Sequence, residues 1–150
     1  MKIRIITVGK KHEPWIKEGI DRFLVRLRQP FDASFEYIAN SSRDGQAARE
    51  EESGKILKLI KDEEFIILLD ERGKNITSTE LSGLLSTNVD KQIIIIIGGA
   101  YGVDENLRNR ANFTWSLSNL VFPHQLVRLI LAEQLYRAQE IHKGSGYHHA

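Results

Sequence analysis

Hydrophobic residues along this chain alternate between compact apolar runs and a helical spacing. Five short runs rich in apolar or β-branched residues predict strands. They lie at Lys2–Val8, Ser34–Ile38, Glu64–Leu69, Gln92–Ile97 and Phe113–Leu117. Two of them, Phe65–Leu69 and Ile93–Ile97, are apolar at every position, which is typical of parallel strands covered on both faces.

Between these runs, apolar residues recur every three or four positions and predict five helices. These helices span Glu13–Arg28, Ala47–Lys61, Thr77–Leu85, Asp104–Ala111 and a last segment from Pro123 or His124 to His142. Thr77 and Glu80 form a capping-box pattern, and Asp104 is a typical N-cap. The polar stretch Asp70–Asn75 predicts a turn. Repeated strand-then-helix order predicts a parallel-sheet α/β sandwich, in one domain over residues 1–150.

The last predicted helix is apolar nearly all round. Its apolar residues do not form one stripe: Leu126, Val127, Leu129, Ile130, Leu131, Leu135, Tyr136, Ala138 and Ile141. Such a helix is buried on more than one side. We expect it to form the interface of a twofold homodimer, and the alternative is a central helix within one chain.

Two loops follow predicted strands and offer a cofactor site. The first is the glycine-rich turn after Ile97, containing Gly98, Gly99 and Gly102, and the second is the loop from Leu117 to Phe122. Loops at strand ends commonly bind cofactors in α/β proteins. A dinucleotide fingerprint is disfavoured, because the glycines follow the fourth strand instead of the first. A purely structural tight turn remains the alternative.

Composition narrows the class of protein. The chain has 150 residues, 41% hydrophobic and 27% charged, which is ordinary for a globular domain. It contains no cysteine, so disulfides, thiolate metal sites and a cysteine nucleophile are excluded. No apolar run is long enough for a signal peptide or membrane span. We therefore expect a cytoplasmic protein.

The net charge of +1 does not by itself indicate a nucleic-acid partner, but the charges are unevenly placed along the chain. The first thirty residues carry eight lysines and arginines and three acidic residues. A basic N-terminal unit is able to face phosphates, and the alternative is a solvated helix face.

The five histidines include a cluster near the C-terminus. They are His12, His124, His142, His148 and His149. No spacing matches a metal site, so we predict none. Tyr147 with His148 and His149 is either a substrate clamp or a frayed tail, since Tyr and His stack on bases and donate hydrogen bonds.

Several segments together resemble the RlmH family of small bacterial ribosomal RNA methyltransferases, members of the SPOUT class. The resemblance covers essentially the whole chain and rests on these stretches: Ile97–Gly102, Trp115–Ser118, Phe122–Leu129, Leu131–Ala138, Tyr147-His148, the opening strand Lys2–Gly9 and Leu69-Asp70. It implies a C-terminal trefoil knot, a homodimer that completes the site, and S-adenosylmethionine as cofactor. It also implies methylation of N3 of a pseudouridine in 23S ribosomal RNA within the assembled 70S ribosome.

The resemblance also implies site residues. The expected cofactor contacts are Leu69, Gly98, Gly99, Leu117, Ser118, Asn119, Leu120, Val121 and Phe122. For the RNA, we expect Tyr147 to stack on the base and His148 or His149 to hydrogen-bond the base or a phosphate. We expect Arg137 to reach a phosphate or the uracil edge across the dimer. His124 either orients the loop or acts as base.

The tail departs from the family pattern, which often ends in Pro-Tyr-His followed by Arg or Lys. Here Gly146 precedes Tyr147, and His149 stands where a permanent cation is common. The extra flexibility and the titratable group put the phosphate contact of the tail in doubt. Two other classes of function stay open: a non-catalytic protein that binds RNA or the ribosome, and a nucleotide-binding α/β module.

Overall fold

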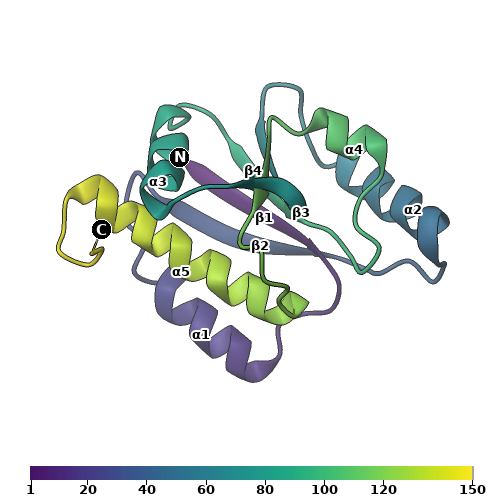
Figure 1. Ribbon diagram of the computed structural model, residues 1–150, viewed down its shortest axis with the longest axis horizontal. Helices are drawn as coiled ribbons and strands as arrows, with labels where there is room; N and C mark the ends of the chain where they lie inside the picture. Colours follow the sequence, from purple (N-terminus) through teal and green to yellow (C-terminus); the bar gives the residue numbers. More distant parts are fainter. Residues whose placement is uncertain (150) are drawn as a thin grey trace.

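A computed structural model describes residues 1–149. Its centre is a five-stranded sheet in the order β2-β1-β4-β3-β5, with every neighbouring pair parallel (Figure 1). The strands are β1 Lys2–Val8, β2 Asp32–Ile38, β3 Phe65–Asn75, β4 Ile93–Ile97 and β5 Phe113–Ser116.

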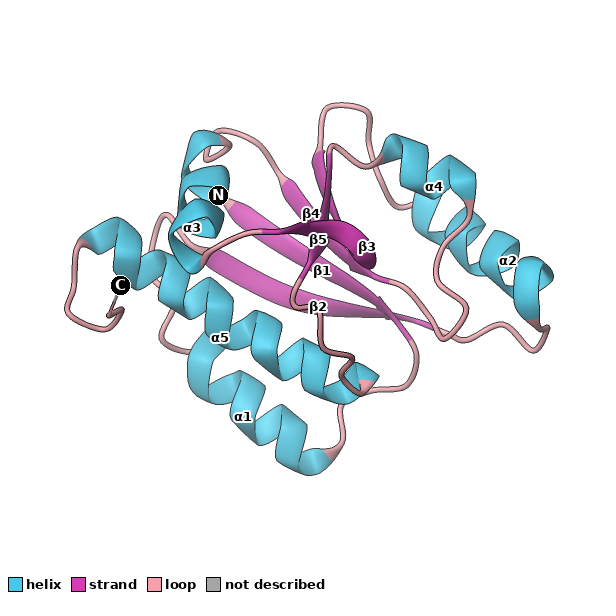
Figure 2. Cartoon of the chain, viewed as in Figure 1, coloured by secondary structure: helices cyan, strands magenta, loops and turns pink. Residues whose placement is uncertain are grey.

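Helices cover both faces of this sheet. They are α1 Pro14–Leu24, α2 Gly45–Leu57, α3 Ser78–Thr87, α4 Glu105–Arg110 and α5 His124–Lys143. Helices α1, α3 and α5 lie on one side of the sheet, and α2 with α4 lies on the other (Figure 2). The predicted parallel-sheet α/β sandwich is confirmed.

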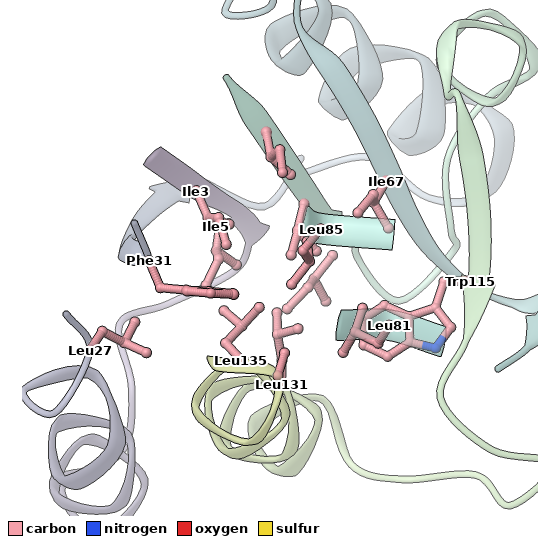
Figure 3. Close-up of a cluster of buried hydrophobic side chains, with 14 residues drawn as sticks. Ile3, Ile5, Leu27, Phe31, Ile67, Leu81, Leu85, Trp115, Leu131 and Leu135 are labelled. Atoms are coloured by element: carbon pink, nitrogen blue, oxygen red, sulfur yellow. The ribbon is translucent and has the colours of Figure 1, made fainter. Parts of the chain in front are cut away.

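The central strand β4 divides the core in two. Ile93, Ile95 and Ile97 belong to the larger cluster, which includes Leu131 and Leu135 of α5 (Figure 3). Ile94 and Ile96 point to the opposite face and pack with residues of α2 and α4. All five isoleucines are buried, because side chains alternate between two covered faces.

The prediction of a turn over Asp70–Asn75 is wrong, because β3 runs on through these residues. The pairing with β5 shifts register after Leu69 and resumes with Lys74 opposite Trp115. At Gly73 the two backbones come so close that a Cβ would lie 2.7 Å from the Thr114 carbonyl. Turn-forming residues here make a bulge within a strand.

Two helices end earlier than predicted. Helix α1 stops at Leu24 instead of Arg28, because the side chain of Gln139 bonds the backbone beyond it: it accepts from Arg28 N–H at 2.6 Å and donates to the Arg26 carbonyl at 3.2 Å. Helix α2 ends at Leu57 instead of Lys61. The capping box of Thr77 and the N-cap of Asp104 are confirmed.

Helix α5 packs on the sheet between α1 and α3. This arrangement is the central-helix alternative, and it explains part of the all-round apolar character within one chain. The homodimer stays a prediction. Leu131, Leu135 and Ala138 are buried in the core, and Ala132 packs against α1. Among residues 1–149, no helix combines the length and apolar character needed to cross a membrane.

Replacing Gly73 by alanine should destabilise the fold. The added Cβ meets backbone atoms of Thr114 and Trp115, which cannot rotate away as a side chain does. We expect the free energy of unfolding to fall by about 1–3 kcal/mol. Urea denaturation measures it, with Gly54→Ala as control, because nothing lies within 4 Å of a Cβ there. Equal stability of the two variants would contradict the close backbone approach at Gly73 in this bulge.

Candidate active site

A cleft of about 810 Å³ opens at the carboxyl ends of β4 and β5, beside residues 69–72 of β3. This edge of a parallel sheet is the usual ligand position in α/β proteins. The lining residues are 69–72, 97–105, 115–118 and 120–122, with Gln46, Arg49, Arg108 and Val127. The cleft is large enough for a nucleoside-sized ligand.

Most residues predicted to touch the cofactor line this cleft. They are Leu69, Gly98, Gly99, Leu117, Ser118, Leu120, Val121 and Phe122, whereas Asn119 is not among the lining residues. The side chains of Leu120 and Val121 are 71% and 85% exposed. Such apolar side chains at a cleft are available to cover a bound ligand.

The glycine-rich turn presents backbone to the cleft. Gly102 has φ of 78°, and its N–H donates to the Gly99 carbonyl at 3.0 Å. A Cβ on Gly99 would lie 2.7 Å from Oε1 of Glu52 and 3.2 Å from Cγ1 of Val8. Glu52 is buried behind the turn, and its other oxygen accepts from Ser41 N–H at 2.8 Å. No larger residue fits at Gly99 without moving the turn.

The rim of the cleft is charged. Asp70 follows the buried part of β3, and its Oδ2 accepts from Arg108 Nη2 of α4 at 2.8 Å. Burial alone would raise the pKa of Asp70, but hydrogen bonds from Arg72 N–H and Arg108 outweigh it, so the pKa lies below its usual value. The cleft therefore combines apolar walls with a fixed ion pair at its mouth.

His124, at the start of α5, fastens the glycine turn. Its Nε2 lies 3.0 Å from the Gly98 carbonyl, and since a carbonyl only accepts, the imidazole donates. Burial lowers the pKa of His124, and nearby Arg128 lowers it further. Of the two predicted roles, this geometry favours orienting the loop over acting as base.

Arg137, Tyr147 and His148 come together around Glu133. Arg137 Nη2 donates to Glu133 Oε2 at 2.9 Å, and the Tyr147 hydroxyl donates to the same oxygen at 3.2 Å. Arg137 Nη1 lies 3.1 Å from His148 Nδ1, and the guanidinium stands 4.8 Å from the Tyr147 ring centre. The tail is therefore packed on α5 and is not frayed, while His149 is exposed.

This tail cluster does not reach the cleft of its own chain. Arg137 lies thirteen residues after His124 on α5, which is about 20 Å along the helix axis. Figure 1 shows the C-terminus at the end of α5 opposite to the loops of α2 and α4. Within one chain the tail cluster and the cleft are therefore separate, and completion of the site by a homodimer stays a prediction.

Glu133, Asp70 and Arg108 are functional candidates that the sequence alone did not single out. Glu133 precedes Arg137 by four residues, a spacing that places both on one helix face and is visible in the sequence. The pairing of Asp70 with Arg108 joins residues 38 positions apart and has no local signal. Within residues 1–149, no group of three or more His, Cys, Asp or Glu side chains is placed to hold a metal ion.

Comparison with known sequences supplies the family. A family profile described as "Predicted SPOUT methyltransferase" matches residues 1–148. The protein named Ribosomal RNA large subunit methyltransferase H from Geotalea daltonii is 39% identical over 153 residues, covering 99% of this chain and 100% of the relative. Proteins of the same name from Geobacter metallireducens and Clostridium botulinum are each 39% identical, and each covers at least 99% of both chains.

The chain belongs to the SPOUT methyltransferase family. The resemblance to RlmH proteins seen in the sequence is thereby confirmed. Membership of a methyltransferase family implies a methyl donor.

His12 gives this SPOUT methyltransferase a pH-dependent stability. Burial, followed by the charge of Arg128, lowers the pKa of His12 to about 4. Between pH 6.5 and 4 the unfolded chain binds more protons there, so the free energy of unfolding should fall as pH falls through this window. In urea denaturation, His12→Gln should lose less stability than the wild type between about pH 7 and 5. Parallel losses would contradict this assignment.

Proposed function

We propose that this protein uses S-adenosylmethionine to methylate N3 of a pseudouridine in 23S ribosomal RNA within the assembled 70S ribosome. One observation carries the proposal. A cleft framed by a glycine turn and an apolar loop stands at the carboxyl ends of β4 and β5, in a chain of a methyltransferase family whose relatives are named for large-subunit ribosomal RNA. A ribosomal substrate also places the protein in the cytoplasm.

The lining residues fit this cofactor. Gly98 and Gly99 line the cleft with backbone, while Leu69, Leu117 and Phe122 offer apolar surface for the adenine ring. Ser118, Asn119, Leu120 and Val121 complete the enclosing loop. When bound, S-adenosylmethionine supplies a methyl group activated by its sulfonium.

In this proposal the tail cluster of Arg137, Tyr147 and His148 binds the RNA base. Because Arg137 Nη1 donates to His148 Nδ1, a neutral His148 carries its proton on Nε2 and is a donor toward a uracil carbonyl. Tyr147 offers a ring for stacking. Methyl transfer to N3 would release the N3 proton to water, and a guanidinium beside the base would favour its deprotonated form. Arg137 would serve here while paired with Glu133.

A second copy of the chain brings the tail to the cleft. In one chain the tail lies about 20 Å along α5 from His124, so the cluster and the cleft cannot act on one base. A twofold axis that pairs α5 with α5 of a second copy in opposite directions sets each tail near the other cleft. Leu126 and Ile130 of α5 are only half-buried and provide apolar surface for this pairing. We also propose the trefoil knot of the SPOUT class in the C-terminal part.

Cofactor binding separates this function from a non-catalytic RNA-binding protein. Titration calorimetry should show binding of both S-adenosylmethionine and S-adenosylhomocysteine to the wild-type protein. If neither compound binds, the proposal that the protein is a methyltransferase using this cofactor is contradicted. Binding of both without methyl transfer to 70S ribosomes would favour the non-catalytic alternative.

A further inference from the structure

The connection between β1 and α1 carries basic and aromatic side chains that the cleft and tail do not use. Together with the first two residues of α1 it runs from Gly9 to Trp15 and includes Lys10 and Lys11. Both lysines are exposed, and within residues 1–149 neither forms an ion pair. The indole of Trp15 is 60% exposed, which is unusual for the largest apolar side chain.

This loop, Gly9–Trp15, is held firmly against the start of α5. Arg128 Nη1 donates to the Lys10 carbonyl at 2.8 Å, and Glu13 N–H donates to Gln125 Oε1 at 3.0 Å. His12 packs edge-on against Phe35 at 4.7 Å between ring centres. A loop fixed at three points presents its exposed side chains at low cost in conformational entropy.

A buried positive charge lies beneath the loop. The Arg128 side chain is 1% exposed, and in the described part of the chain no carboxylate lies within ion-pair distance of it. Its neighbours are neutral groups: the Lys10 carbonyl at 2.8 Å, His12 Nδ1 at 3.3 Å and the ring of Tyr37 at 5.8 Å. An arginine stays protonated, so its charge adds to that of Lys10 and Lys11. Glu13 is the loop's one acidic residue.

The loop also adjoins the cleft. Arg128 packs against Gly9, and His124, one turn earlier on α5, bonds the Gly98 carbonyl in the cleft wall. Figure 1 shows the connection from β1 to α1 beside the beginning of α5, at the same end of the sheet as the cleft loops. RNA bound at the cleft would therefore extend across this loop.

We infer that the loop Gly9–Trp15 is an RNA-contacting surface, in which Lys10 and Lys11 bind backbone phosphates and Trp15 stacks on an unpaired base. Adjacent cations with an exposed aromatic ring are the combination that binds single-stranded or looped RNA. The inference takes its RNA substrate from the proposed function. It adds Lys10, Lys11 and Trp15, to which the proposed function assigns no role.

Cosedimentation with 70S ribosomes, without cofactor and over a range of salt concentrations, tests it. Trp15→Ala should weaken binding about 5- to 150-fold, and Trp15→Phe much less. Lys10→Ala with Lys11→Ala should weaken binding and reduce the slope of log affinity against log salt by about 0.7 for each phosphate that is no longer neutralised. Lys58→Ala with Lys61→Ala, two exposed lysines beyond the end of α2, is the matched control and should bind like the wild type.

Three results would overturn the inference. The first is unchanged binding of the loop variants. The second is weaker binding of the Lys10→Ala, Lys11→Ala variant with an unchanged salt slope, which indicates contact with a ribosomal protein. The third is a change of oligomeric state in Trp15→Ala, which indicates a contact between copies. Failure of the proposed function is read separately, from methyl transfer by the wild type. A wild type that transfers no methyl group, with variants that still bind ribosomes more weakly, would overturn the proposed function and support the loop.

Discussion

Replacing Arg137 by alanine should lower kcat/KM for methylation of 70S ribosomes by about 100-fold, since the loss of one charged partner in a desolvated contact costs several kcal/mol. The change removes the donor to His148 and the cation beside Tyr147 at once. Arg137→Lys keeps the charge but not the forked geometry, so it should recover only part of the rate.

Stability does not account for this effect. Arg137 pairs with Glu133 at the helix surface, and such an i,i+4 pair contributes about 0.3–0.5 kcal/mol. The variant should therefore unfold at nearly the wild-type urea concentration and bind S-adenosylmethionine normally. Lys143→Ala, exposed on the same helix, is the control. A rate for Arg137→Ala within about twofold of the wild type would contradict a role for the tail cluster.

The second large effect is expected at the glycine turn. Gly99→Ala places a Cβ 2.7 Å from Glu52 Oε1, and Glu52 is buried and cannot swing into solvent. The turn must move, and we expect the Kd for S-adenosylmethionine to rise about 100-fold, as befits a contact made through positioned backbone.

Calorimetry measures this effect, with Gly83→Ala of α3 as the matched control. Nothing lies within 4 Å of a Cβ on Gly83, so alanine should stabilise the helix by about 0.5–1 kcal/mol and leave cofactor binding unchanged. Wild-type affinity in Gly99→Ala would show that the turn does not touch the cofactor.

The sheet was predictable from local pattern, but the details set by distant residues were not. The five isoleucines of β4 marked a doubly covered strand, and Thr77 with Glu80 marked the start of α3. The end of α1 depends on Gln139, more than a hundred residues away. The extension of β3 beyond Leu69 depends on its register against β5, which turn residues alone do not reveal.

The candidate site likewise has a part that the sequence predicts and a part that it does not. Residues that follow strands, such as Gly98 and Leu117, fall on the cleft because the carboxyl ends of parallel strands share one edge. Arg137 and Tyr147 could be recognised by residue type, but their place at the far end of α5 could not. In the function we propose, their relation to the cleft requires a second chain, whose placement the apolar pattern of α5 alone does not specify.

Mass spectrometry of 23S ribosomal RNA tests the central claim most directly. Wild-type protein and S-adenosylmethionine are incubated with 70S ribosomes, free 50S subunits or naked RNA from cells that lack the activity. We predict one methyl group on N3 of a single pseudouridine, in the 70S sample and not in the others. No gain of methyl in any sample, from protein that binds the cofactor, would contradict methylation of ribosomal RNA by this protein.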